Sequence, residues 1–182
     1  MMLEDYCVID LEMTGLNPKH HKILEVAAVR VRKKEIVSEC SMLIRQHQPL
    51  EKKITELTGI DQEMLAGAKE EDEVLDCFFG FLGEDILVGQ NVIFDYSFLK
   101  QAAINRKQPF ERKAADTLKI ARRCLPALEK RTLDALCGYY GIEIGHHHRA
   151  LDDAKATYLL YERLEEEFGT VQADVFEPKP LL

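Results

Sequence analysis

The sequence predicts an α/β domain built on a mixed β-sheet of about five strands flanked by helices. Two segments near the start, KILEVAAVRVR and EIVSECSMLIR, are rich in Val and Ile and are separated by a polar KK, as in an antiparallel hairpin. From residue 84 onward, short apolar runs alternate with segments of helical periodicity, a pattern typical of parallel strands joined by helices. Both kinds of strand in one chain indicate a mixed sheet.

The first strand is expected in YCVIDLE, residues 6–12, because this apolar run ends at the turn-like TGLNP. The hairpin strands follow, and the remaining expected elements are, in order, a helix-turn pattern in 52–65, a helix in EDEVLDCFFGFLG, a strand in DILVGQN, a helix in 95–105, a strand in AADTL, and helices in 117–124, 132–140 and 149–168. The final GTVQADVFEPKPLL contains two prolines and is interpreted as a tail. The expected division is therefore a domain at 1–168 and a tail at 169–182.

Length and composition are consistent with one globular domain. The chain has 182 residues, of which 46% are hydrophobic and 31% charged, which excludes a disordered polypeptide. It contains no apolar run of the roughly 18 to 20 residues that cross a bilayer, and MMLEDYCVID does not resemble a signal peptide, so we expect a cytoplasmic protein. The net charge of −8 disfavours a stable nucleic-acid coat protein but allows an acidic cluster that binds metal.

Acidic residues occur where strands end or helices begin. Asp10 and Glu12 are two apart in the first strand, so their side chains should share one face, where burial is costly without a cation. The alternative is an ordinary solvated strand end. Asp95 lies four residues after Asn91 in GQNVIFDYSFL, where a helix cap would use the same residue types.

A histidine run precedes a further acid in HHHRALDDA. His148 could take a proton from water beside a metal, and Asp153 lies at the start of the expected last helix. A solvated loop is the alternative for the three histidines. Oxygen ligands without a cysteine motif favour Mg²⁺ or Mn²⁺, and a pair of such ions suits phosphodiester hydrolysis.

The segments VIDLEMTGL, GQNVIFDYSFL and HRALDDA, in this order, resemble the three motifs of the DnaQ-like DEDD exonuclease superfamily. This superfamily includes the proofreading domain of bacterial DNA polymerase III, oligoribonuclease and RNase T, and has a ribonuclease H-like fold. The resemblance covers residues 5–168. It implies a 3′→5′ exonuclease that binds two Mg²⁺ or Mn²⁺ ions through Asp10, Glu12, Asp95 and Asp153.

The spacing of the third motif resembles the histidine branch of the superfamily, called DEDDh, because His148 precedes Asp153 by five residues. The resemblance implies that His148 is the general base. It also implies that Thr14 contacts the 3′-hydroxyl and that Leu16 wedges against a base. The full set of expected substrate contacts is Met13, Thr14, Gly15, Leu16, Asn91, Phe94 and His148.

The substrate class is indicated by two conflicting features. LEMTG is similar to the oligoribonuclease version of the first motif, whereas ADTLKIAR and KRTLDALCGYYGIEIG are closer to the proofreading domains. We therefore expect single-stranded DNA, with RNA or short oligonucleotides as the alternative. The expected partners are the 3′ end of the strand and, as a candidate, a DNA polymerase, with no membrane involved. A non-catalytic binding module is disfavoured because every catalytic position is filled.

Overall fold

The computed structural model describes residues 3–146, 148–169 and 174–182. Its centre is a six-stranded sheet in the order β3-β2-β1-β4-β5-β6. The strands are β1 (Tyr6–Met13), β2 (Ile23–Arg32), β3 (Glu35–Leu43), β4 (Leu87–Gly89), β5 (Ala114–Asp116) and β6 (Val175–Phe176). β1, β2 and β3 pair antiparallel, β1, β4 and β5 pair parallel, and β6 is antiparallel to β5. The mixed sheet is thus confirmed, with one strand more than expected.

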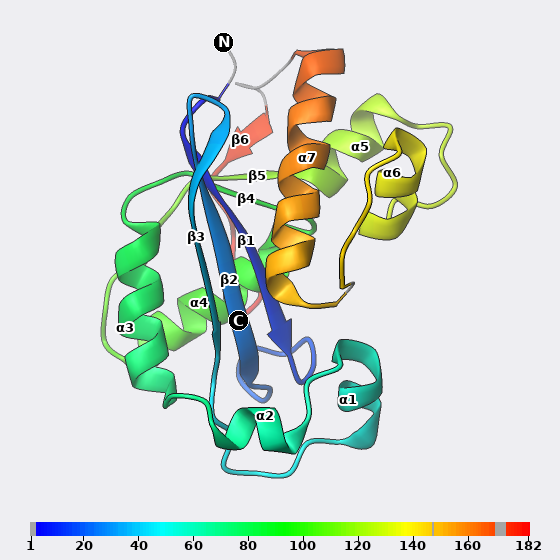
Figure 1. Ribbon diagram of the computed structural model, residues 1–182. Helices are drawn as coiled ribbons and strands as arrows, with labels where there is room; N and C mark the ends of the chain where they lie inside the picture. Colours follow the sequence, from blue (N-terminus) through cyan, green and yellow to red (C-terminus); the bar gives the residue numbers. More distant parts are fainter. Residues whose placement is uncertain (1–2, 147, 170–173) are drawn as a thin grey trace.

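Seven helices surround the sheet in the described residues, as Figure 1 shows. They are α1 (Lys52–Thr58), α2 (Gln62–Ala66), α3 (Glu71–Leu82), α4 (Val92–Asn105), α5 (Thr117–Cys124), α6 (Leu133–Tyr140) and α7 (Ala150–Phe168). The helix expected in 95–105 begins three residues earlier, at Val92, directly after the tight turn that follows β4. Asp95 therefore lies in the first turn of α4.

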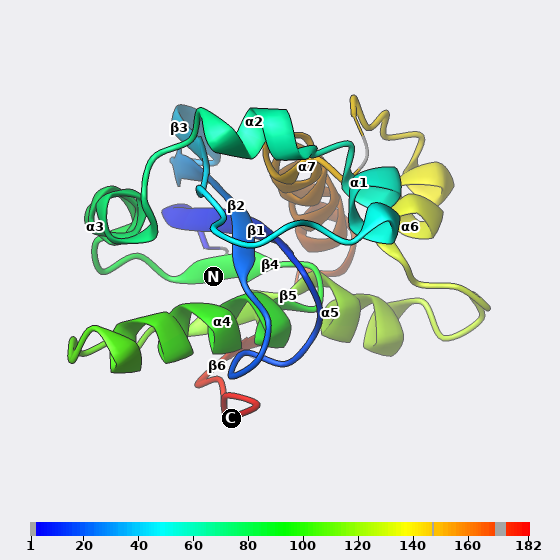
Figure 2. The same cartoon turned by 90° about the horizontal axis from the view of Figure 1, so that it is seen from below.

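Each face of the sheet is covered by its own layer of helices, because successive side chains of β1 point to opposite faces. Cys7, Ile9 and Leu11 pack in one apolar cluster with residues of α3 and α4. Tyr6 and Val8 pack in a second cluster with α5, α6 and α7. Figure 2 shows α4 and α7 on opposite sides of the central strands.

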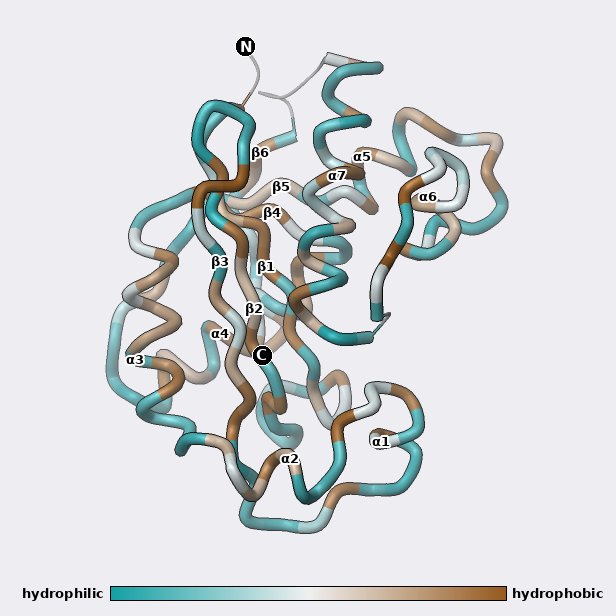
Figure 3. The backbone as a smooth tube through the Cα atoms, viewed as in Figure 1, coloured by the Kyte–Doolittle hydropathy of each residue, from teal (hydrophilic) through white to brown (hydrophobic). Residues whose placement is uncertain are grey.

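The burial of the strands follows their position in the sheet. β2 is central, and its first seven residues are buried although one of them is a glutamate. β3 is an edge strand, and its residues are exposed or half-buried. Figure 3 shows hydrophobic residues along β1 and β2 and hydrophilic residues at the turn between β2 and β3.

Described residues of the segment interpreted as a tail pack against the domain. Val175 and Phe176 form β6 beside β5, and Asp174 pairs with Arg123 of α5. The backbone N–H of Leu181 donates to Ser97 Oγ over 2.8 Å. Two residues are too few to show an alternating pattern, so the pairing is determined by packing onto the exposed edge of β5.

No helix of the described chain combines the length and the apolarity required to span a bilayer.

Candidate active site and metal centre

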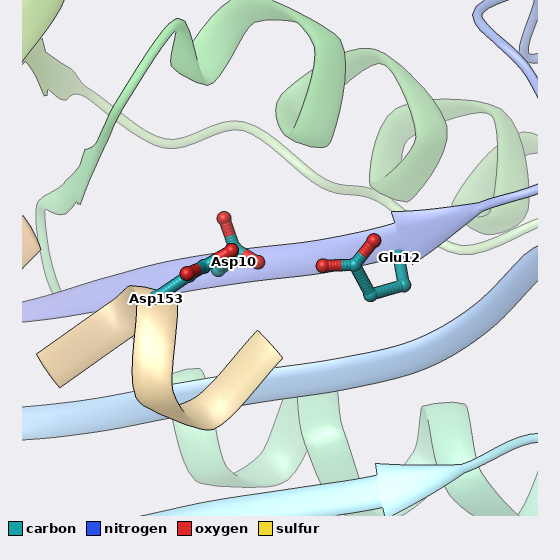
Figure 4. Close-up of side chains that lie close together, drawn as sticks. All are labelled: Asp10, Glu12 and Asp153. Atoms are coloured by element: carbon teal, nitrogen blue, oxygen red, sulfur yellow. The ribbon is translucent and has the colours of Figure 1, made fainter. Parts of the chain in front are cut away.

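Three carboxylates converge where β1 meets the first turn of α7. Asp10 and Glu12 lie on the same face of β1 as Tyr6 and Val8, which is the face that α7 covers. Asp153 is on the first turn of α7. One carboxylate oxygen from each of Asp10, Glu12 and Asp153 lies within 4.8 Å of the other two, and Figure 4 shows the three side chains together.

Asp95 approaches this group from the opposite layer. Its side chain is 5% exposed, and its Oδ1 accepts a hydrogen bond of 2.9 Å from the backbone N–H of Leu11, between Asp10 and Glu12. Among the described residues, Asp95 is outside the group of three that meets the 4.8 Å criterion. It is nevertheless near enough that its charge raises the pKa of Asp10.

The carboxylates repel one another in a poorly solvated space. Burial, followed by the charges of Asp95, Glu12 and Asp153, raises the pKa of Asp10 well above its usual value. Burial and the charge of Asp153 raise the pKa of Glu12 to about 9. Burial is also the main cause that raises the pKa of Asp95 to about 8. The site therefore holds its carboxylates as anions only at the expense of stability, unless a cation binds.

One buried oxygen of the cluster has no hydrogen-bond partner among the described residues. Oδ2 of Asp10 is buried and accepts no hydrogen bond from the described residues. A buried carboxylate oxygen without a donor is costly, and a divalent cation would relieve that cost. Oxygen donors of this kind fit Mg²⁺ or Mn²⁺.

His148 lies two residues before the start of α7, and its backbone contacts Asp153. Its backbone has a φ of 66°, in the left-handed region, and its N–H donates to Oδ2 of Asp153 over 3.2 Å. The neighbouring His146 is exposed and lies 3.4 Å from Oδ2 of Asp152. His146 and Asp152, which do not have the five-residue spacing of His148 and Asp153, are thus paired with each other. His147 is outside the described residues.

The residues expected to contact substrate lie at two adjoining places. Thr14 follows β1, and its Oγ1 accepts a hydrogen bond of 2.9 Å from the N–H of Lys22. A β-carbon at Gly15 would lie 2.5 Å from the ring of His21, so a side chain there would require that ring to move. Leu16 is 64% exposed.

Asn91 and Phe94 lie at the start of α4, and Met13 ends β1. Asn91 occupies the N-cap position of α4, as the cap interpretation expected, but its side chain makes no capping hydrogen bond. Its backbone has a φ of 54°, and its N–H donates to Oδ1 of Asp116 over 2.9 Å. Asp116 is buried, and this hydrogen bond fixes the turn that leads into α4, the helix that carries Asp95.

A cavity of about 770 Å³ opens beside Thr14. It is bordered by basic and imidazole side chains, including Lys22, Arg45 and His47, and by Glu70. It is not lined by Asp10, Glu12 or Asp153, so it adjoins the carboxylate cluster rather than containing it.

Sequence reasoning missed two charged residues beside the cluster, Glu25 and Arg149. Glu25 is 1% exposed and pairs with Arg149, whose Nη2 lies 2.8 Å from Glu25 Oε2. The available signal was a single glutamate within the apolar run ILEVAAV, because a buried carboxylate requires a partner.

The fold and the carboxylate cluster fit a metal-dependent exonuclease domain. Residues 7–161 match the sequence model of the RNase T exonuclease family, and the chain belongs to this family. The expected resemblance is thereby confirmed. Members of the family depend on divalent metal ions, consistent with the cluster described above.

Similar curated proteins include DNA polymerases III of the PolC type. The chain is 39% identical over 154 residues to the protein of Clostridium perfringens (strain 13 / Type A), covering 85% of this chain and 11% of that protein. It is 37% identical over 166 residues to that of Bacillus subtilis (strain 168), covering 90% and 12%. The chain therefore spans only about a tenth of the length of these relatives.

Solved structures with this fold include two nucleases of similar size. Exonuclease X, in complex with 5′-overhanging duplex DNA, is 26% identical, with a TM-score of 0.74 over 93% of this chain and 96% of that one. The nuclease domain of 3′hExo, a DEDDh family member bound to rAMP, is 20% identical, with a TM-score of 0.79 over 98% of each chain. The expected ribonuclease H-like fold is confirmed.

Proposed function

We propose that this domain is a 3′→5′ exonuclease that removes nucleoside 5′-monophosphates from single-stranded nucleic acid, with DNA as the preferred substrate. The observation that carries the proposal is the convergence of Asp10, Glu12 and Asp153 within 4.8 Å in a chain of the exonuclease family. The similarity to polymerases III of the PolC type supports DNA as the substrate. We further propose that residues 1–168 form the catalytic domain.

Four carboxylates would hold two divalent cations, Mg²⁺ or Mn²⁺. Asp10 would hold the ions together with the other carboxylates, since its buried Oδ2 accepts no hydrogen bond from the described residues. Glu12 and Asp153 would complete one site, and Asp95 would contribute to the other. When bound, the ions supply positive charge that stabilises the attacking and leaving oxygens at the phosphorus.

The remaining roles belong to groups beside the carboxylates. His148 would accept the proton of the attacking water, a role supported by the hydrogen bond between its backbone and Asp153. Thr14 would donate its hydroxyl hydrogen to the 3′-hydroxyl, since Oγ1 already accepts from Lys22. Exposed Leu16 would pack against a base. The other substrate contacts proposed are Met13, Gly15, Asn91, Phe94 and the side chain of His148.

Association with a DNA polymerase is a further part of the proposal. Similar domains occur within PolC-type polymerases, of which this chain matches about a tenth. A free-standing or polymerase-bound domain would carry out the same hydrolysis.

The competing candidate is an exonuclease for RNA or short oligonucleotides, which the LEMTG form of the first motif favours. The test uses single-stranded DNA, RNA of the same sequence and dinucleotides, each labelled at the 5′ or the 3′ end, with Mg²⁺ and with Mn²⁺. We expect immediate release of a 3′-terminal mononucleotide and progressive shortening of the 5′-labelled DNA. Selective digestion of RNA or dinucleotides would establish the alternative.

Asp10→Ala and Asp153→Asn serve as the catalytic controls of that assay. Both should abolish mononucleotide release while the circular dichroism spectrum stays that of the folded protein. Retention of activity in both variants would overturn the assignment of the site.

A further inference from the structure

Glu25 forms a buried anchor beneath the start of α7. Its Oε1 accepts a hydrogen bond of 2.7 Å from the backbone N–H of Ala150, the first residue of the helix. Nη2 of Arg149 donates to Oε2 over 2.8 Å, and Nε of Arg149 lies 3.3 Å from both oxygens. The side chain of Arg149 makes no capping hydrogen bond itself, so Glu25 supplies the anion at this helix N-terminus from β2.

These contacts leave Glu25 no role as a metal ligand. Both of its oxygens already accept from Arg149 or Ala150, and it is 1% exposed. It is also absent from the described group of carboxylates that lie within 4.8 Å of one another. Glu25 therefore acts on the site through the residues it binds.

The position of the pair indicates more than fold stability. Glu25 is the direct partner of Glu12 in the β1–β2 register, and like charges opposite each other destabilise a sheet. A buried ion pair also offers little net stability compared with well-packed apolar side chains. Arg149 offsets this repulsion, since its charge opposes the rise in the pKa of Glu12.

The anchor secures a strained segment. His148 has a φ of 66°, a conformation that costs of the order of 1 kcal/mol or more and persists only where neighbouring contacts enforce it. The two residues that follow His148, Arg149 and Ala150, both donate hydrogen bonds to Glu25. The N–H of His148 itself donates to Asp153. The segment from His148 to Ala150 is thus fastened to β2 and to the cluster.

We propose that Glu25 is a positioning residue that, through Arg149 and Ala150, sets the placement of His148 relative to the carboxylate cluster. The inference rests on the proposed function insofar as His148 is the general base. Glu25 would then affect the proton-transfer step and leave the capacity of the cluster to bind metal intact.

The experiment compares Glu25→Gln, which is isosteric and lacks the charge, with Arg149→Lys, which keeps a charge but loses the planar guanidinium. Asp174→Asn is the matched control: Asp174 has a 3% exposed side chain, is bound by Arg123 and follows the opposite end of α7. For each variant, kcat, KM, Tm and Mn²⁺ affinity by electron paramagnetic resonance are measured. Amide hydrogen exchange at His148 and Ala150 is followed by NMR.

We expect Glu25→Gln and Arg149→Lys to lower kcat by about 10- to 100-fold, with KM and Mn²⁺ affinity changed by less than about threefold. Exchange at His148 and Ala150 should accelerate relative to the wild type. Asp174→Asn should lower Tm at least as much while changing kcat by less than about twofold. In a His148→Ala background, Glu25→Gln should add less than about a twofold further loss, because both changes remove the same contribution.

A loss in Glu25→Gln that multiplies fully with that of His148→Ala would overturn the inference, as would unchanged exchange at His148 and Ala150. Should Glu25→Gln fail to fold, Arg149→Lys provides the same measurements. The exchange result does not depend on catalysis. Failure of the proposed function, seen as full activity in Asp10→Ala, is therefore distinguishable from failure of the anchor.

Discussion

The backbone N–H of Leu11 donates to Oδ1 of Asp95 over 2.9 Å, which joins α4 to the strand segment between Asp10 and Glu12. Asp95 thus has a structural bond as well as its proposed role in metal binding. Asp95 and Leu11 are both buried, 5% and 4% exposed, so the N–H of Leu11 would lack a ready substitute partner if the carboxylate were removed.

The two roles of Asp95 can be separated by substitution. Asp95→Asn retains an oxygen that can accept from Leu11 and removes a charge whose pKa is raised to about 8. We predict that this variant keeps or gains stability without metal and loses mononucleotide release by about 100-fold or more. Asp95→Ala should lose the same activity and also about 1–3 kcal/mol of stability. Urea unfolding and a 3′-label release assay measure both quantities; equal stability of the two variants would contradict the structural role.

Asp10→Asn should stabilise the metal-free domain and weaken its binding of metal. The substitution removes the negative charge of a carboxyl whose pKa is raised by burial and by the charges of three neighbouring acids. We predict a Tm in EDTA at pH 8 that is higher than that of the wild type by about 3 °C or more. Mn²⁺ binding, followed by electron paramagnetic resonance, should fall by at least about tenfold. A lower Tm in EDTA would show that the carboxylate repulsion is not a significant strain.

The parts of the site that could be predicted are those determined by local periodicity. Asp10 and Glu12 share a face because side chains two apart on a strand always do, whatever the fold. The placement of Asp153 in the first turn of α7 similarly follows from the helical pattern after residue 149. In both cases, the relevant distances along the chain are short.

The missed features depend on contacts between distant segments. Glu25 and Arg149 are 124 residues apart, and nothing local to either identifies the other. Asn91 does occupy the N-cap position of α4, but its left-handed backbone is held by Asp116, a residue 25 positions away, and its own side chain makes no capping hydrogen bond. Such pairs are specified only when the sheet order brings their elements together.

The last strand should contribute measurably to stability. Phe176 packs on the cluster between the sheet and α4, and Lys119 Nζ lies 3.6 Å from the centroid of its ring. Because Phe176 is only partly buried, we predict that Phe176→Ala costs about 1–3 kcal/mol in urea unfolding. Leu182→Ala, at a 46% exposed side chain, is the control and should change stability by less than about 0.5 kcal/mol. Equal effects would mean that β6 does not stabilise the domain.

Without metal, the stability of the domain should fall as the pH rises, because no cation offsets the negative charges of the ionised carboxylates. The folded-state pKa of Glu12 is raised from 4.5 to about 9, so its contribution to stability is full below pH 4.5 and is lost as the pH rises toward 9. We predict that Tm in EDTA falls between pH 5 and pH 9 by about 5 °C or more, and that Mg²⁺ or Mn²⁺ largely removes this decline because a bound cation favours the ionised carboxylates. In Glu12→Gln the decline in EDTA should be smaller, since one carboxyl with a raised pKa is gone while Asp10 and Asp95 remain.

Differential scanning calorimetry in matched buffers measures each Tm. A decline of the same size in Glu12→Gln and wild type would exclude Glu12 as its source, and a decline unaffected by metal would mean that the cations do not bind at the carboxylates.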